Sequence, residues 1–301
     1  MHEHVARVLY YVHIHLLYAS IVGLAAWALT AVRGGSAGAK YWVWVAASLN
    51  FALPIGAIVD GLLPSYLGWA TPLGTLGALA STLSDGTAGM VLALVWLTGS
   101  AAMATRLGAR LRAELRAGRA RPCDPSFVAG GVPVRFAGHG PAVAGVLRPS
   151  ISLPRGIDRL LSRPELDAVL LHELTHARRR DNLVRLLHEL GLCLLWFHPL
   201  VWLAGARLSL YRELSCDDQV IRRARGRDLV SALAKLARSD DALLLQANAS
   251  SLIRHRLERL AGAPRPPSRA RTALVAALFA ATLVWGIFAT VAHTACCFVH
   301  R

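Results

Sequence analysis

Long uncharged runs alternate with Arg-rich segments along this chain. Four runs lack Asp, Glu, Lys and Arg: residues 8–32, 41–58, 87–105 and 272–299. Each is long enough for a membrane-crossing helix, which needs about 20 apolar residues. The first run has no basic leader and no small-residue cleavage site, so we expect a retained anchor and not a signal peptide. The pattern predicts an α-helical membrane protein with about four transmembrane helices.

A further uncharged stretch, Gly61 to Ser84, is predicted not to cross the membrane. It contains Pro64, Pro72 and four glycines, which disfavour a continuous helix. We interpret it as an extracytoplasmic loop that rests on the membrane surface. If this stretch also crossed, the basic loop at residues 33–40 would face outward, against the positive-inside rule.

The formal net charge of +15 comes almost entirely from Arg, with Lys only at positions 40 and 235. The basic residues gather at 33–40, 106–121 and 265–271. Because Lys and Arg collect on the cytoplasmic side, this distribution predicts that both termini lie outside. The localisation expected is the bacterial inner membrane.

These charges divide the chain into three parts. We expect a three-span membrane region at 1–105, a cytoplasmic domain at 106–271, and a fourth span with a short external tail at 272–301. No basic run is interleaved with aromatic residues or opens a recognition motif. Direct nucleic-acid binding is therefore not expected.

The cytoplasmic region contains one helix with a clear start signal. Ser162-Arg-Pro-Glu165 has the pattern of a capping box, in which the serine and the glutamate satisfy backbone groups reciprocally. Leu166, Val169 and Leu170 follow at helical spacing and are predicted to face the core.

The same helix carries the sequence VLLHELTHARRRDN. His172 and His176 are four residues apart, so both side chains project from one face, as two imidazole ligands of one zinc ion must. Glu173 can reach the reacting water as general base. An HExxH string should arise by chance in about one such sequence in a hundred, so a plain solvated helix face is a weak alternative. His188-Glu189 has leucine where a second histidine would be needed and is not a site on this logic.

A catalytic zinc keeps three protein ligands, so a third ligand is required. Residues 190–203 are apolar except for His198, too short to span, and split by Pro199, which predicts a buried or membrane-touching helical hairpin. At 1.5 Å per residue, the first arm, Asp181 to Phe197, rises about 24 Å, and the second arm, Pro199 to Glu213, returns about 21 Å. The second arm is therefore expected to bring Glu213 back to the level of the histidines. Asp217, on the same face, could hold an imidazole by its outer nitrogen. The alternative is a solvated face whose carboxylates balance nearby arginines.

Three segments in order, LRPSISLP, VLLHELTHARRRDN and LLWFHPLVWLAGARLSLYRELSCDD, resemble the BlaR/MecR family of integral-membrane zinc metallopeptidases. The resemblance is strong over residues 140–225, and the order of spans agrees along the rest. It implies an inserted cytoplasmic α+β domain of the gluzincin type. Antibiotic-sensing members carry a large penicillin-binding domain beyond the last span, whereas this chain stops at Arg301. We therefore do not expect beta-lactam acylation of this polypeptide.

The resemblance also implies roles for individual residues. The zinc ligands would be His172, His176 and Glu213, with Glu173 as the base and Asp217 orienting His172. Three further residues would form an edge strand on which an extended substrate adds by main-chain pairing: Ile151, Ser152 and Leu153.

The leading hypothesis is a zinc metalloendopeptidase of a bacterial signalling system. The resemblance suggests a cytoplasmic winged-helix repressor as substrate, with self-cleavage as a second reaction. One alternative is a membrane quality-control peptidase of HtpX type. Another is a non-catalytic receptor or scaffold with structural zinc, against which Glu173 argues because a structural site needs no base. The expected partners are the lipid bilayer, the repressor and a second copy of the chain.

Overall fold

The structure is a computed structural model. It describes residues 2–32, 35–53, 87–118, 128–136, 140–223, 225–238, 256, 259–260 and 268–296. The predicted surface loop, Gly61 to Ser84, lies outside the described residues, as does the end of the predicted second span. Within the described part the fold is mostly helical, with one small sheet.

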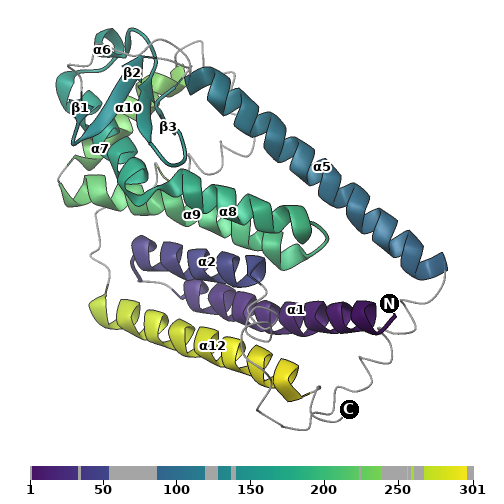
Figure 1. Cartoon of the computed structure of the whole chain (residues 1–301). Helices are drawn as coiled ribbons and strands as arrows, with labels where there is room; N and C mark the ends of the chain where they lie inside the picture. The colour runs from purple at the N-terminus through teal and green to yellow at the C-terminus, as the bar shows by residue number, and fades with distance from the viewer. Residues whose placement is uncertain are drawn as a thin grey trace.

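Four long helices come from the predicted membrane segments: α1 (His2–Ala31), α2 (Ala37–Ala52), α5 (Thr87–Gly118) and α12 (Arg269–Cys296). Among the described residues, three stretches are long and apolar enough to cross a membrane: Val12–Ala31, Gly89–Arg116 and Arg269–Thr290. In Figure 1, α1, α2 and α12 lie side by side, and α5 runs along the other side of the molecule. The described part of α2 is shorter than these stretches, so the count of four spans stays a prediction.

The second helix is fixed tightly inside the protein. Its first turn is capped by Ser36, whose hydroxyl accepts the backbone N–H of Ala39 at 3.1 Å. Tyr41 and Trp44 are fully buried, and the Trp44 indole donates to the Thr30 hydroxyl of α1 at 3.1 Å. Helix α2 packs against α8 (Asp181–Leu194) and α9 (Pro199–Arg222). A predicted membrane segment is therefore in direct contact with the region that carries the metal-ligand motif.

Helices α8 and α9 form the predicted hairpin. The chain turns at Leu195 to His198, and Pro199 begins the second arm, where its missing N–H costs nothing. Leu194, Phe197 and Trp202 near the turn are all substantially exposed. Exposed apolar side chains at the tip, together with the packing of both arms on α2, agree with a membrane-touching hairpin.

The small sheet has the strand order β1-β2-β4-β3. Its strands are β1 (Val128–Ala129), β2 (Val132–Phe136), β3 (Ala142–Ala144) and β4 (Ser150–Leu153). Strand β4 is parallel to β2 and antiparallel to β3, so both of its edges are already paired.

This order corrects one prediction. Ile151, Ser152 and Leu153 do not form an edge strand, because β2 and β3 flank them on both sides. Ile151 and Leu153 are fully buried and belong to the same core cluster as Val169 of α7 (Arg163–Arg179). Their alternation places side chains in the core and leaves no main-chain edge for a substrate. The strands at the two ends of the sheet are β1 and β3.

Helix α7 begins as the sequence predicts. The Ser162 backbone N–H donates to Glu165 at 2.7 Å, which completes the capping box. Leu166 and Val169 pack with Val220 of α9 and Leu229 of α10 (Gly226–Arg238). The short helix α6 (Ile157–Leu160) adds Ile157 to this core. A second core is formed by α1, α2, α9 and α12. Helix α9 contributes residues to both cores and so connects them.

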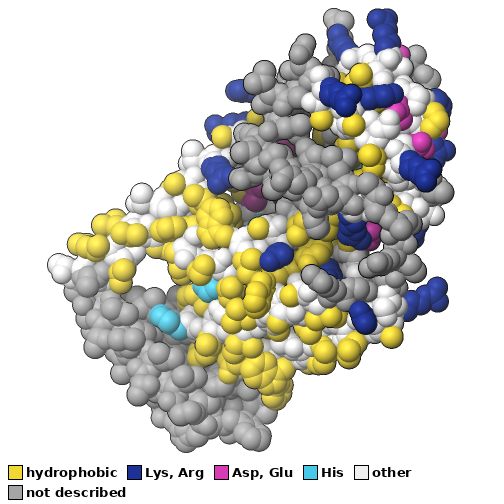
Figure 2. All heavy atoms as spheres, turned by 180° about the vertical axis from the view of Figure 1, so that it is seen from behind, with side chains coloured by type: hydrophobic (Ala, Val, Ile, Leu, Met, Phe, Trp, Pro, Cys, Tyr) yellow, Lys and Arg dark blue, Asp and Glu magenta, His cyan; other side chains and the backbone are white. Residues whose placement is uncertain are grey.

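The exposed side chains over the long helices differ in type from those around the sheet. In Figure 2 hydrophobic side chains form a broad band over the long helices, whereas Lys and Arg gather mostly around the part with the sheet. Helix α5 is the most exposed of the three candidate spans, since only 6% of its apolar stretch is buried inside the protein. Such an apolar, unburied helix fits a lipid environment and would be unstable in water.

Candidate metal centre

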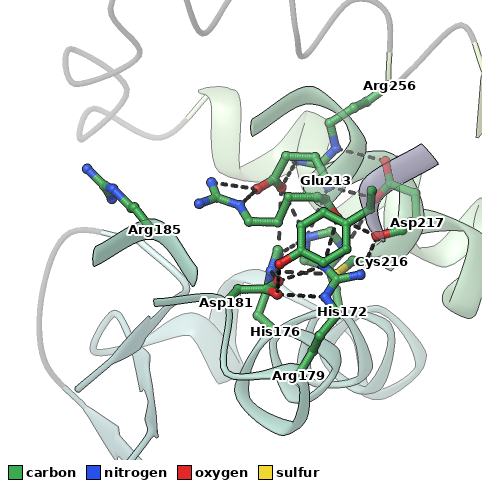
Figure 3. A network of polar contacts seen from close by, with 12 residues as sticks. His172, His176, Arg179, Asp181, Arg185, Glu213, Cys216, Asp217 and Arg256 are labelled. Carbon is green, nitrogen blue, oxygen red and sulfur yellow. Dashed lines mark hydrogen bonds and ion pairs between the residues drawn. The ribbon is translucent and has the colours of Figure 1, made fainter. Parts of the chain in front are cut away.

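Helices α7 and α9 bring three metal-ligating side chains together. His172 Nε2 and His176 Nε2 lie 3.1 Å apart, and Glu213 Oε2 lies 3.4 Å from the first and 3.8 Å from the second. The two imidazoles come from successive turns of one helix, and the carboxylate comes from the second arm of the hairpin. Figure 3 shows the three converging on one point. This confirms the prediction that the second arm of the hairpin brings Glu213 back to the level of the two histidines.

The donor set suits zinc. One ligand atom from each of the three residues lies within 4.8 Å of the others, and two imidazoles plus a carboxylate are a common zinc set with an open fourth position. A second group, formed by His176, Asp181 and Cys216, also meets this distance. It would use the other nitrogen of His176, which lies 2.6 Å from the Asp181 carboxylate and is already engaged. The first group therefore fits a metal better.

A carboxylate lies close to the Nδ1 atom of each imidazole. His172 Nδ1 lies 3.2 Å from Asp217 Oδ1, as expected from the position of Asp217 one turn after Glu213. His176 Nδ1 lies 2.6 Å from Asp181 Oδ2. Such partners fix the ring orientation and the tautomer that presents Nε2 to a metal.

The sequence analysis missed Asp181. Five positions after His176, it would leave that face if the helix continued. Arg180 breaks the helix with left-handed backbone angles, φ 57° and ψ 45°, and ends α7. Asp181 then starts α8 and points back at His176. A non-glycine residue in this conformation is uncommon and marks a constrained turn.

The sequence analysis also missed Arg256. Its guanidinium donates to both oxygens of Asp217, at 2.9 and 2.8 Å, and lies 3.4 Å from both Glu213 Oε2 and His172 Nε2. Only 8% of the residue is exposed. Arg212 adds a second cation to Glu213, at 3.0 Å. No periodic pattern leads to Arg256, and its neighbours in the chain mostly lie outside the described residues.

A cavity of about 320 Å³ opens beside the ligand atoms. Glu173, which is 8% exposed, lines it together with the three candidate ligands. Ala142 and Val143 of the end strand β3 form one wall, and Leu229, Leu233 and Leu236 of α10 form another. The cavity thus combines a metal-ligand cluster, a carboxylate, a strand and an apolar wall.

The sequence profile of the BlaR1 peptidase M56 family matches residues 78–260, more than half of the chain. The chain belongs to the M56 peptidase family. Regulatory protein BlaR1 of Bacillus licheniformis is 42% identical over 86 residues, which cover 27% of this chain and 14% of that relative. The methicillin resistance mecR1 proteins of Staphylococcus aureus and Staphylococcus epidermidis are 26% identical over 82 residues, with the same coverage of 27% and 14%. The aligned segment is therefore a small part of these relatives, and no solved structure matches the chain.

The resemblance to the BlaR/MecR family is confirmed. The family is one of peptidases, and three of the described helices are long and apolar enough to cross a membrane. His172, Glu173, His176 and Glu213, to which the resemblance gave site roles, line the cavity from α7 and α9.

The carboxylates around the M56 site raise the pKa values of both histidines. Burial lowers the pKa of His172, but bonds with Asp217 and Glu213 outweigh it and raise the pKa to about 9. The pKa of His176 is also raised well above its usual value, since Asp181, Cys216 and Glu213 outweigh burial. Burial raises the pKa of Glu213, yet its bonds with both histidines hold that pKa well below the usual range.

Proposed function

We propose that this M56 family member is a zinc-dependent endopeptidase that cleaves a cytoplasmic transcriptional repressor. The observation that carries the proposal is the convergence of His172, His176 and Glu213 within 4.8 Å beside Glu173 and an open cavity. These three side chains would hold the zinc ion, which supplies Lewis-acid polarisation of the scissile carbonyl. The name of one relative, regulatory protein BlaR1, supports a regulatory role.

The chain's own residues would carry the proton transfers. Glu173 accepts a proton from the attacking water and donates it to the leaving amine nitrogen, so that the peptide bond breaks with no net change in the enzyme. Asp217 and Asp181 hold the two imidazoles in register throughout. Arg256 places a positive charge 3.4 Å from Glu213 and His172, where it can offset negative charge that develops on the carbonyl oxygen.

An extended substrate would lie along β3. This strand is at one end of the sheet and lines the cavity, whereas β4 is paired on both sides. Asn182 of α8 already donates to the Val143 and Gly145 carbonyl oxygens, at 2.9 and 3.0 Å. We place substrate pairing on β3, where a bound peptide would displace the Asn182 amide from the Val143 carbonyl oxygen.

The proposal includes a topology. The peptidase region, about residues 106–271, would be an inserted cytoplasmic α+β unit of gluzincin type between the third and fourth of four spans. Both termini would lie outside. The support is the three basic clusters, the apolar helices α1, α5 and α12, and the sheet that precedes α7. The cluster of ligands would then face the compartment that contains repressors.

Co-expression tests the function. The wild-type chain and a winged-helix repressor from a neighbouring gene should together give a shorter repressor fragment on a blot. Glu173→Gln should abolish the fragment because it removes the base and no ligand. Glu189→Gln is the matched control: it alters the second His-Glu pair, whose carboxylate binds Arg110 and Arg185 and does not itself line the cavity, and it should leave cleavage unchanged.

A quality-control peptidase would give a different result. It would degrade misfolded membrane proteins and leave the folded repressor intact. Equal repressor cleavage by wild type and Glu173→Gln would refute zinc-peptidase action at this site. A metal-bound but inactive wild type would instead favour the receptor or scaffold.

A further inference from the structure

Tyr41 of α2 reaches the metal centre from a predicted membrane helix. Its hydroxyl donates to Asp181 Oδ1 at 2.8 Å, across 140 positions of sequence. Tyr41 is fully buried, and Asp181 is only 3% exposed. This bond is therefore shielded from water, which makes its geometry more restrictive than that of a surface contact.

The Asp181 carboxylate uses its full bonding capacity. Oδ1 accepts from Tyr41 at 2.8 Å and from Arg179 Nε at 2.6 Å. Oδ2 meets Arg179 Nη2 and His176 Nδ1, both at 2.6 Å. An ionised carboxylate has about four acceptor positions, so this one is held by four donors at once. Its orientation, and with it that of the His176 ring, depends on all of them.

Arg179 forms a second link between Tyr41 and Asp181, because it contacts both. Its guanidinium carbon lies 3.9 Å from the centre of the Tyr41 ring, while its nitrogens grip Asp181. The arginine is further tied to α9, through the Ser215 hydroxyl and the Arg212 carbonyl oxygen. Helices α2, α7, α8 and α9 therefore meet at one carboxylate, in contact with a candidate zinc ligand.

We propose that Tyr41 is a positioning residue of the metal site: through Asp181 it holds the His176 imidazole, so that the placement of α2 sets how tightly zinc is bound. This inference rests on the proposed function, in which His176 is a ligand. Hydrogen bonds weaken steeply beyond about 3.2 Å, so a shift of α2 by less than 1 Å breaks the Tyr41 contact. A change among the membrane helices would in this way alter the metal centre.

The test compares two buried tyrosines of the same core. Tyr41→Phe removes one oxygen and keeps the ring against Arg179. Tyr211→Phe is the matched control, because the Tyr211 hydroxyl donates to the Thr30 carbonyl oxygen at 3.2 Å and does not contact Asp181. Zinc affinity is measured on the purified full-length protein by competition with a chelator. The unfolding temperature of the chelated protein is measured in parallel.

We expect Tyr41→Phe to weaken zinc binding by about threefold to tenfold, which is less than the loss of about tenfold to a hundredfold typical for a direct partner of a metal ligand, because Tyr41 acts through Asp181. Tyr211→Phe should leave the affinity unchanged. In an Asp181→Asn background, Tyr41→Phe should have no further effect. The absorption of cobalt substituted for zinc should shift with Tyr41→Phe only, which loss of fold stability alone would not produce.

Each other outcome decides against the inference. Unchanged zinc affinity in Tyr41→Phe, or equal losses in both tyrosine variants, would overturn the positioning role. The same holds if Tyr41→Phe only lowers the unfolding temperature of the chelated protein. A wild type that holds no zinc would refute the proposed function itself, and the role of Tyr41 with it.

Discussion

His176 Nδ1 lies 2.6 Å from Asp181 Oδ2, although the two residues are five positions apart and belong to different helices. The contact exists because Arg180 adopts left-handed backbone angles and turns the chain back on itself. Asp181 is 3% exposed and also binds Arg179 and Tyr41. The second imidazole is thus oriented by the turn between α7 and α8, and the first by Asp217 of α9.

Asp181→Asn should weaken zinc binding by about tenfold to a hundredfold, as loss of an outer carboxylate partner usually does. The amide keeps the shape of the side chain but loses the charge that stabilises the imidazole tautomer. Asp217→Asn should give a similar loss. Asp218→Asn is the control, because Asp218 pairs with Arg259 and not with a histidine. Chelator competition measures all three, and equal affinity in wild type and Asp181→Asn would show that the carboxylate does not support the ligand.

Zinc affinity should rise with pH between about 6.5 and 8.5. A zinc-bound imidazole must be neutral, whereas in the metal-free protein the His172 pKa is about 9 and the His176 pKa is also raised. Below those values, protons compete with the metal, and each proton displaced makes the affinity about tenfold stronger per pH unit. Calorimetric titration in two buffers of different ionisation enthalpy should show that protons are released as zinc binds. Binding without proton release would mean that the imidazoles are already neutral.

The parts of the site that follow helical geometry were predictable. Four-residue spacing places His172 and His176 on one face, and a fixed rise per residue returns Glu213 to their level. Asp181 was not predictable, since its position depends on one left-handed residue that no periodicity reveals. The contact of Tyr41 with the site was also not predictable from the sequence, because it depends on the packing of α2 against α8 and α9.

The order of the strands in the sheet could not be predicted from the sequence, for a different reason. Ile151 to Leu153 is only a short alternating segment in the sequence, and the structure buries Ile151 and Leu153 in a strand that is paired on both sides. Alternation does not say which strands lie on either side, because neighbours in a sheet are set by connections and core packing. The order β1-β2-β4-β3 puts the best-patterned strand inside and the weakly patterned Ala142–Ala144 at the end.

Reporter fusions should resolve the topology. Fusions after Gly35, Leu107 and Arg265 are expected to report the cytoplasm, and those after Ser65 and Arg301 the outside. The reason is that each cytoplasmic point lies in or beside one of the three basic clusters. A cytoplasmic signal at Ser65 would contradict the model of three N-terminal spans and would require a different path between α2 and α5.

Two glycines of α5 should respond in opposite directions to alanine. A Cβ at Gly99 would overlap the indole ring of Trp196 near the hairpin turn, 2.6 Å from its Nε1. The ring has little freedom to move, because its N–H donates to the Trp96 carbonyl oxygen at 3.2 Å. At Gly108 a Cβ would meet no atom within 4 Å. Helix propensity favours alanine by about 1 kcal/mol at either site, whereas overpacking costs about 1–3 kcal/mol at Gly99 alone.

Thermal unfolding of the detergent-solubilised protein should therefore show a lower transition temperature for Gly99→Ala and a slightly higher one for Gly108→Ala. A change of 1 kcal/mol corresponds to about 2–4 °C in a chain of this size class, which is measurable. Trp196→Ala should relieve the overlap, so that adding Gly99→Ala to it no longer destabilises. If Gly99→Ala alone raised the transition temperature as Gly108→Ala does, α5 would not be packed against the hairpin. The peptidase region would then have lost its contact with the third predicted span.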